Sequence, residues 1–434
     1  MKHSLHTRRQ FLRTSILGGA LSWTVPAFLE RTFFTLDAIA ADSAIQSTTG
    51  KDGPILIVLQ LAGGNDGLNT LVPFADDAYF RARPTLAIPA AETLRLNDAL
   101  GLNPKLSGLK SLYDEGQLAI LQGVGYPNPN RSHFRSTEIW HTASDSSVTE
   151  KYGWMGRYFD SCCKGEDPSV GVSIGSQPPQ AFAAPEPRGI TFSRPEQFRF
   201  DLKNTTDRTA ADGFFRSVNE PDSEQMEGGS IGMLAGHAEG TGSALDFLQR
   251  TSLDAVMSSD KVAEIIKRTK PGASYPSNRL ADSLNLVARL IGGGMPTRVY
   301  YIAQGGYDTH SNQIGAHTKL MEELNSSLTA FCADLKSQGH FDRILLMTFS
   351  EFGRRVAENA SGGTDHGAAA PLFVLGGKVK PGLHGSTPSL TQLHDGDIIH
   401  RVDFRSVYAT ILAHWLKAPV EPILKGRFPL LPFV

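Results

Sequence analysis

The stretch ILIVLQL at residues 55–61, which runs through Ala62 into GGND at 63–66, decides the fold class of this chain. A short apolar run bounded by glycines is typical of a strand that is buried on both faces of a sheet. Three further runs lie next to loops that carry acidic or histidine residues: RVYYIA (298–303) before GGYDTH (305–310), ILLMTF (344–349) before SEFG (350–353), and PLFVL (371–375) after GTDHG (363–367). Alternation of such runs with helical segments predicts an α/β fold with a central, mostly parallel sheet flanked by helices.

Acidic and histidine side chains in these loops predict a metal site. The loops at the carboxyl ends of strands in an open α/β sheet converge on one crevice, where ligands bind. Carboxylates and imidazoles are ligands of divalent cations, here zinc, magnesium, calcium or manganese. The expected ligands are Asp66, Asp308, His310, Glu351, Asp365 and His366. The alternatives are a plain turn at Asp66, local packing of the histidines, and a salt-bridged helix start at Glu351.

A second motif, NRSHF at 130–134, follows the apolar run at 118–122 and stands where a helix is expected to begin. A helix N-terminus favours phosphate or sulfate, and a metal could activate the Ser132 hydroxyl for attack on such a group. The other interpretation is that Ser132 only caps the helix. His133 could be a ligand, an acid or a structural donor, and we group it with Ser132 as catalytic.

Polar residues beside these loops are expected to bind an anionic substrate. Arg354 or Arg355 would lie near the site if Glu351 is a ligand, and a guanidinium can hold an anion through paired hydrogen bonds. Asn65, Arg131 and Arg354 are therefore the expected substrate-binding residues.

The first 40 residues have the features of an export signal, and we set them aside from the fold. TRRQFLR at 7–13 is a twin-arginine start, an uncharged stretch follows at 14–29, and AIA at 38–40 is a cleavage pattern. The stretch falls short of the ~20 residues that a spanning helix needs. We expect a protein exported folded by the twin-arginine translocase, periplasmic or secreted, with no stable membrane span in its mature form.

Charge and cysteine content exclude some classes of protein. The chain has 42 basic and 44 acidic residues; residues 1–40 hold five and two of these, which leaves 37 against 42, a net charge of −5. Such a balance gives no basic surface for nucleic acid. Three cysteines do not make a disulfide framework.

The chain is expected to form one α/β core around a middle insertion. Residues 41–164 and 291–434 carry the strand and helix patterns. Residues 165–290 form an insertion or cap, rich in Gly, Pro, Ser and charge up to 245 and helical in spacing toward 290.

These residues resemble a bacterial domain-of-unknown-function family, the one numbered fifteen-oh-one, which is grouped with the alkaline phosphatase and sulfatase superfamily. The motifs that carry the resemblance are LQLAGGNDGLNTLVPF (59–74), GVGYPNPNRSHFRSTEIWHTAS (123–144), GWMGRYFD (153–160), GGYDTHSNQ (305–313), FSEFGRRVAENASGGTDHGAAAPLFVLGG (349–377) and DFRSVYATILAHWL (403–416).

The resemblance implies an alkaline-phosphatase-like sheet with two metal ions beside a nucleophile. It implies that Asp66 is the first ligand, Ser132 the nucleophile, and Asp308 with His310 a later ligand pair. The Asp-His dipeptide of the superfamily matches Asp365-His366 by motif but Glu351-Phe352 by strand position, and phenylalanine cannot bind a metal.

Two functions follow as expectations. The first is an exported, metal-dependent hydrolase that acts on small anionic esters of phosphate or sulfate. The alternative is a catalytically degenerate member of the same fold that serves as an exported binding or assembly protein.

Overall fold

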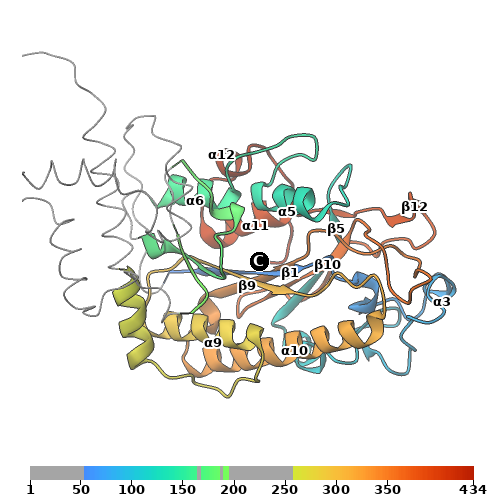
Figure 1. Ribbon diagram of the computed structural model, residues 1–434, viewed down its shortest axis with the longest axis horizontal. Helices are drawn as coiled ribbons and strands as arrows, with labels where there is room; N and C mark the ends of the chain where they lie inside the picture. Colours follow the sequence, from blue (N-terminus) through green and yellow to red (C-terminus); the bar gives the residue numbers. More distant parts are fainter. Residues whose placement is uncertain (1–52, 164–167, 186–188, 195–257) are drawn as a thin grey trace, which may run out of the picture. The chain divides into compact units, whose positions relative to one another are not determined.

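The structure is a computed structural model that describes residues 53–163, 168–185, 189–194 and 258–434 (Figure 1). The described parts of 53–194 and 260–434 belong to one compact unit. The proposed signal at 1–40 and residues 195–257 of the expected insertion lie outside the described residues. Within 165–290, the segments at 171–174 and 190–192 are strands of the central sheet, and 279–292 is a helix that packs beside it.

A nine-stranded sheet forms the centre of this unit, in the order β11-β5-β10-β9-β1-β8-β6-β7, with β14 also paired to β5. All of these pairings are parallel except those of β10, which runs antiparallel to both of its neighbours. The strands are β1 (Ile55–Ala62), β5 (Leu118–Gly125), β6 (Gly171–Ile174), β7 (Ile190–Phe192), β8 (Val299–Gly305), β9 (Ile344–Phe349), β10 (Ala370–Leu375), β11 (Gly382–His384) and β14 (Val402–Asp403). The expected α/β fold with a mostly parallel sheet is confirmed.

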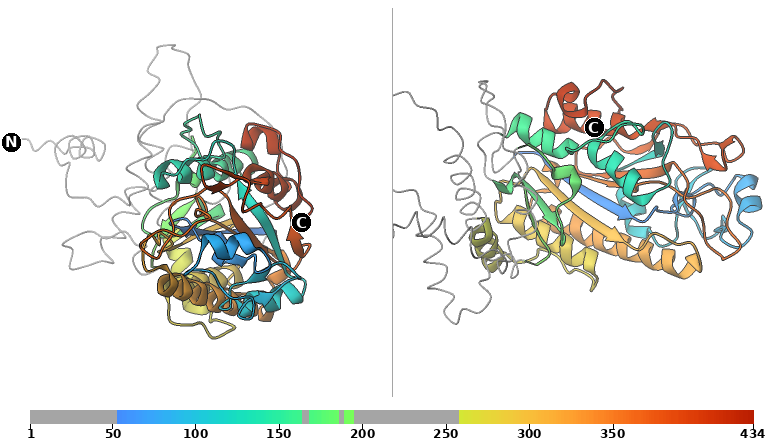
Figure 2. Two further views of the ribbon diagram at one scale, coloured as in Figure 1. Left: turned by 90° about the vertical axis from the view of Figure 1, so that its right-hand side faces the viewer. Right: turned by 45° about the horizontal axis from the view of Figure 1, so that its top comes forward.

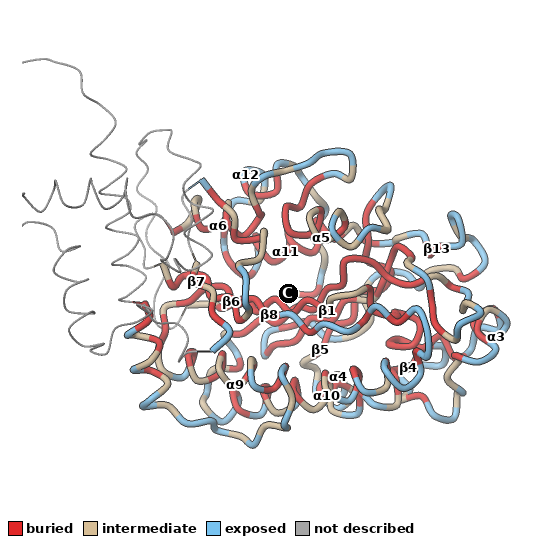
Figure 3. The backbone as a smooth tube through the Cα atoms, in the orientation of Figure 1, coloured by how far each residue is buried: buried red, intermediate tan, exposed pale blue. Residues whose placement is uncertain are grey.

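Helices cover both faces of the sheet (Figures 1 and 2). One face carries α5 (His133–Thr142), α6 (Trp154–Cys162), α11 (Phe404–Thr410) and α12 (Val420–Leu424); the other carries α4 (Ser107–Asp114), α9 (Arg279–Gly292) and α10 (Gln313–Ser337). Burial on both sides explains why β1, β5 and β9 are almost continuously apolar rather than alternating (Figure 3).

Aromatic side chains fix α5 and α11 to the sheet. The ring of Trp140 stacks on Phe404 at 4.3 Å between centroids and on Phe349 of β9 at 5.1 Å. Trp154 stacks on Tyr408 at 4.4 Å. Stacked pairs add to the free energy that burial alone supplies, so α5 is held over the end of β9 through Trp140.

Smaller elements lie outside the main sheet. They are a three-stranded sheet of β2 (Leu71–Val72), β4 (Gly101–Leu102) and β3 (Leu94–Arg95), a pair of β12 (Leu393–His394) and β13 (Asp397–Ile398), and α3 (Asp77–Ala82). Among the described residues, no helix combines the length and the apolar character required to cross a membrane.

The reversed direction of β10 matters for the site. Because β5, β9, β1 and β8 run one way, their carboxyl ends share one edge of the sheet, and the amino end of β10 lies at that same edge. The loop before β10 therefore joins the loops that follow the other strands.

Candidate metal centre

Backbone geometry brings the loops after β1, β8 and β9 into contact. Gly63 has a φ of 122°, and a Cβ on it would stand 2.5 Å from the backbone nitrogen of Asp308. Only glycine allows both this conformation and this approach. On the other side, Arg354 and His366 form an isolated antiparallel bridge, and Gly367 donates its N–H to Gly353 O at 2.8 Å. The segment before β10 is thereby paired with the segment after β9.

Three imidazoles converge on the carboxylate of Asp308. Nε2 of His310 and Nε2 of His366 each lie 3.0 Å from Asp308 Oδ1, and 2.9 Å from each other. Nε2 of His133 lies 3.4 Å from Asp308 Oδ2 and makes no hydrogen bond. The ligand atoms of His133, Asp308 and His366 all lie within 4.8 Å of one another. We refer to His133, Asp308, His310 and His366 as the candidate metal centre, shortened below to the metal centre.

The other ring nitrogen of each histidine faces a group that can only accept a hydrogen bond. Nδ1 of His133 lies 2.8 Å from Glu351 Oε1, and Nδ1 of His366 lies 2.8 Å from the carbonyl oxygen of Arg131. Nδ1 of His310 lies 3.3 Å from Asp365 Oδ1. In the neutral form of each ring, the acceptor fixes the proton on Nδ1 and leaves a lone pair on Nε2.

This arrangement is the usual second layer of a histidine metal site. Metal-bound histidines donate their other N–H to a carboxylate or a carbonyl, which fixes the ring and raises its basicity. Without a cation, lone pairs of His310, His366 and Asp308 would face one another at about 3 Å. Either a shared proton or a metal ion would relieve that repulsion. Three imidazoles and one carboxylate match the ligands of zinc in number and kind.

Arg354 lies beside the centre and holds its loops together. Its side chain is fully buried, and Nη2 donates to Asp308 Oδ1 at 2.7 Å. The guanidinium also donates to carbonyl oxygens of all the converging loops: Gly63, Gly64, Tyr307 and Thr364. Desolvation would raise the pKa of Asp308, but the hydrogen bond from Arg354, the contact with His366 and the charge of Arg354 lower it well below its usual value, with a further contribution from the nearby His133. Asp308 is thus a carboxylate in the folded protein.

Asp66, expected as a metal ligand, lies in a buried polar network. Its carboxylate is fully buried and forms an ion pair with Arg83, with 2.6 Å between Oδ2 and Nη1. Burial would raise the pKa of Asp66, but the charge and hydrogen bond of Arg83 dominate with smaller contributions from His317 and Gln313, so it is lowered. Oδ1 of Asp66 has no hydrogen-bond partner. The structure does not bring Asp66 into the group of His133, Asp308 and His366.

The remaining expected residues lie around the centre in different roles. Glu351 and Asp365, which we expected as ligands, contact the Nδ1 atoms of His133 and His310. Asn65 is buried, with its side chain directed at Thr70 and His317. Arg131 binds Asp397 through its guanidinium, at 2.7 Å between Nη2 and Oδ2.

Ser132 occupies the N-cap position of α5, but its side chain makes no capping hydrogen bond. It is exposed and directly precedes His133 of the metal centre. The hydroxyl and the first N–H groups of the helix are therefore not paired with each other, and such N–H groups attract anions.

Several residues of this region escaped the sequence analysis. Arg83 lies in RARP at 81–84, a stretch without any strand-end signal, and Gln313 and His317 lie in the first turns of α10. Asn359 donates to Asp365 Oδ1 at 3.1 Å and so fixes the partner of His310. Only the proximity created by the fold identifies them.

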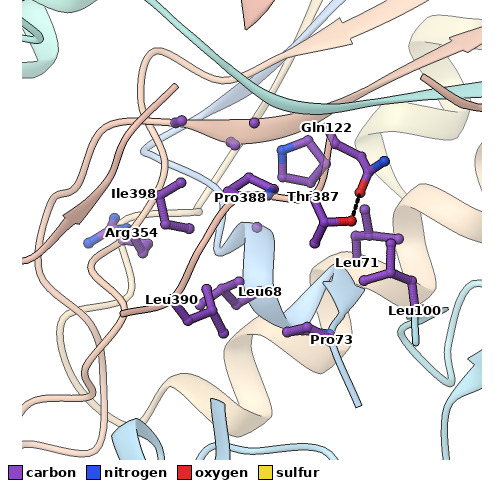
Figure 4. Close-up of a pocket in the computed structure, with 15 residues that line it drawn as sticks. Leu68, Leu71, Pro73, Leu100, Gln122, Arg354, Thr387, Pro388, Leu390 and Ile398 are labelled. Carbon is purple, nitrogen blue, oxygen red and sulfur yellow. Dashed lines mark hydrogen bonds between the residues drawn. The ribbon is translucent and has the colours of Figure 1, made fainter. Parts of the chain in front are cut away.

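An apolar pocket lies next to this region and is lined by a different set of residues (Figure 4). Leu68, Leu71, Leu390 and Ile398 line it, and Thr387 donates to Gln122 at its wall. Of the expected site residues, only Arg354 contributes to its lining. The pocket is not the metal centre.

Replacing Glu351 by Gln tests the orientation of His133. Glu351 Oε1 accepts from Gly63 N and from His133 at 2.8 Å each, in a nearly closed environment. An amide of the same size keeps the shape but removes the charge that makes His133 basic. We expect zinc affinity, measured by competition with a chelating dye, to fall about 10–100-fold. The control is Glu358→Gln, whose carboxylate binds Thr85 and Leu86; equal affinity in both variants would contradict this role of Glu351.

Comparisons with solved structures give distant similarities. A protein of the alkaline phosphatase superfamily from Vibrio parahaemolyticus has 9% identity, 78% coverage of this chain and 64% of its own, and a TM-score of 0.35. The PsFucS1 sulfatase from Pseudoalteromonas sp. has 11% identity, coverages of 85% and 69%, and a TM-score of 0.35. The C-terminal periplasmic domain of EcEptC from Escherichia coli, solved in complex with zinc, has 8% identity, coverages of 77% and 75%, and a TM-score of 0.32.

No match is found among curated proteins. The family described as "Protein of unknown function (DUF1501)" matches residues 54–416, a span that contains the central sheet and every residue of the metal centre. The chain therefore belongs to the DUF1501 family.

Proposed function

We propose that this protein is a metal-dependent hydrolase of phosphate or sulfate esters. The observation that carries the proposal is the convergence of three Nε2 atoms on Asp308, with each Nδ1 held by an acceptor. The residues that would hold the ion are His133, Asp308, His310 and His366. An imidazole-rich set favours zinc over magnesium or calcium. A divalent cation there would polarise an ester oxygen and neutralise charge that develops on it.

The chain itself supplies groups for an anionic ester. The N-terminus of α5, uncapped by Ser132, would bind non-bridging oxygens of the ester. We assign the Ser132 hydroxyl as the nucleophile because it is exposed, makes no capping bond and adjoins His133. Arg354 keeps Asp308 ionised and in place. The openness of Asp308 and His310, whose side chains are 47% and 44% exposed, would admit a substrate.

Metal removal and a serine variant test this function together. Protein purified with zinc is assayed on phenyl phosphate and phenyl sulfate before and after dialysis against a chelator, and again after zinc is restored. We expect hydrolysis to stop and return. Ser132→Ala should lower kcat at least ~100-fold, as loss of a nucleophile does, while Ser326→Ala on the outer face of α10 should not. Stable zinc with no hydrolysis of either ester would reject the hydrolase.

The second candidate is a degenerate member that acts as an exported binding or assembly protein. Two contacts favour it: Asp66 is paired with Arg83, and Asp308 Oδ1 is shared with Arg354. Two of the four carboxylates that were expected to bind metal are thus already paired with a buried cation. This candidate would be supported by a protein that shows no hydrolysis and that binds another molecule equally well as the wild type and as Ser132→Ala.

We also infer export in the folded state through the twin-arginine translocase to the periplasm or beyond. The support is the sequence TRRQFLR at 7–13 with the cleavage pattern at 38–40. Replacement of Arg8 and Arg9 by Lys should leave the protein in the cytoplasm, as cell fractionation would show.

A further inference from the structure

Two arginines share one buried carboxylate beside the metal centre. Asp397 has a side chain only 4% exposed; its Oδ2 lies 2.7 Å from Nη2 of Arg131, and its Oδ1 lies 3.8 Å from Nε of Arg355. Nε of Arg131 also donates to the same Oδ2 at 2.8 Å, while Oδ1 accepts no hydrogen bond from the described residues. One carboxylate therefore faces two guanidinium groups, and the better geometry belongs to Arg131.

Arg355 is paired with Asp397 only at long range. Its side chain is 39% exposed, and no hydrogen bond of its guanidinium to the described residues is present. The backbone of Asp365 is hydrogen-bonded to that of Arg355, but Asp365 Oδ1 already faces Asn359 and His310. A partly exposed guanidinium has free donors in a planar fork, which suits a carboxylate, sulfate or phosphate.

The backbone holds Arg355 in a fixed place relative to the metal centre. Its N–H donates to Asp365 O at 3.0 Å, and its carbonyl accepts from the buried Arg83 at 2.9 Å. Arg131, the other partner of Asp397, accepts the Nδ1 proton of His366 on its carbonyl oxygen. Arg355 is thus connected to the centre from two sides, through Asp365 and through Asp397 with Arg131.

We propose that Arg355, positioned by Asp397 and Arg131, is a subsite for a second anionic group of the substrate. The inference rests on the proposed function and refines its substrate class: an ester of phosphate or sulfate that carries another carboxylate, sulfate or phosphate beside the scissile group. Arg355 would bind that second group and so determine specificity, while the metal centre holds the ester.

Equilibrium binding tests the subsite without turnover. The probes are phenylphosphonate and 4-(carboxymethyl)phenylphosphonate, which differ by one carboxylate, titrated by calorimetry into the full chain purified with zinc. We expect the second probe to bind roughly tenfold more tightly, as a hydrogen bond to a charged group would give. In Arg355→Gln the ratio of the two Kd values should fall to about one, and Arg355→Lys should restore part of it. Arg427→Gln, on a residue 85% exposed near the C-terminus, is the matched control and should keep the ratio.

The outcomes separate the subsite from the hydrolase. A ratio near one in the wild-type protein, or a ratio that persists in Arg355→Gln, overturns the subsite even if phenyl phosphate or phenyl sulfate is hydrolysed. Binding of neither probe also overturns it. A ratio that depends on Arg355 supports the subsite even in a protein that hydrolyses neither ester, in which case only the hydrolytic function is lost.

Discussion

Asp308→Ala is expected to abolish metal binding at the centre. Asp308 is the residue on which His310 Nε2 and His366 Nε2 converge at 3.0 Å and which His133 Nε2 approaches at 3.4 Å. Without it, three imidazoles remain beside the buried guanidinium of Arg354, whose positive charge then opposes a cation. Mass spectrometry of metals should find near-stoichiometric zinc in the wild-type protein and almost none in the variant.

The control for this experiment is Asp365→Asn. Asp365 contacts Nδ1 of His310 and not the ion side of the ring, so an amide oxygen can still accept that proton. Zinc should bind more weakly in this variant but remain detectable. Zinc retained in Asp308→Ala at the wild-type level would place the metal elsewhere, and absence of metal from the wild-type protein would favour the shared-proton explanation of the histidine contacts.

Arg83→Leu should have the largest effect on stability. The side chains of Arg83 and Asp66 are both 0% exposed, and Arg83 also donates to Asn69 Oδ1, Val356 O and Arg355 O. Removal of one partner leaves a buried charge uncompensated, which costs about 3–5 kcal/mol. Urea unfolding at pH 7 should show this loss in the free energy of unfolding.

A double variant and a surface variant serve as controls for Arg83→Leu. Arg83→Leu combined with Asp66→Leu should lose less than the single variant, because no charge is left unpaired. Lys110→Ala removes the exposed pair with Asp114 and should cost at most about 1 kcal/mol. The pKa of Asp66 is lowered in the folded protein. The ion pair therefore contributes fully to stability above the usual pKa of an aspartate, and this contribution is lost as the pH falls from that value through the lowered pKa of Asp66. A cost of Arg83→Leu equal to that of Lys110→Ala would refute a stabilising pair.

The sequence was sufficient for the sheet because its strands have a strong local signal. The runs at 55–61, 298–303 and 344–349 are apolar at all but one position each, and they form the adjacent strands β1, β8 and β9. The reversal of β10 has no such signal, since an apolar run does not encode its direction. The start of α10 at Gln313 likewise depends on tertiary contacts, because Gln313 and His317 bind Asp66 and Asn65 in the loop after β1.

The site could be predicted in part, because several of its residues directly follow strands that have a strong local signal. Residues after strands, such as Asp308 and His310, are recognisable from their place in the chain. What each contacts depends on side chains that arrive from elsewhere: Arg83 reaches Asp66, and Glu351 turns to the Nδ1 of His133. No spacing in the sequence distinguishes a carboxylate that faces an ion from one that supports a histidine.

The central position of β1, between β8 and β9, also has a consequence for how the protein folds. Its neighbours lie more than two hundred residues further along the chain, and the contact of His366 with Arg131 spans 235 residues. Pairings of such long range form slowly and late, so the four ligands meet only in a chain whose two halves have already assembled. A metal ion held by these residues would then bind the finished structure rather than nucleate folding, and it would stabilise that structure by about 2.7 kcal/mol when its free concentration exceeds Kd a hundredfold. Metal occupancy would thus serve as a readout of completed folding.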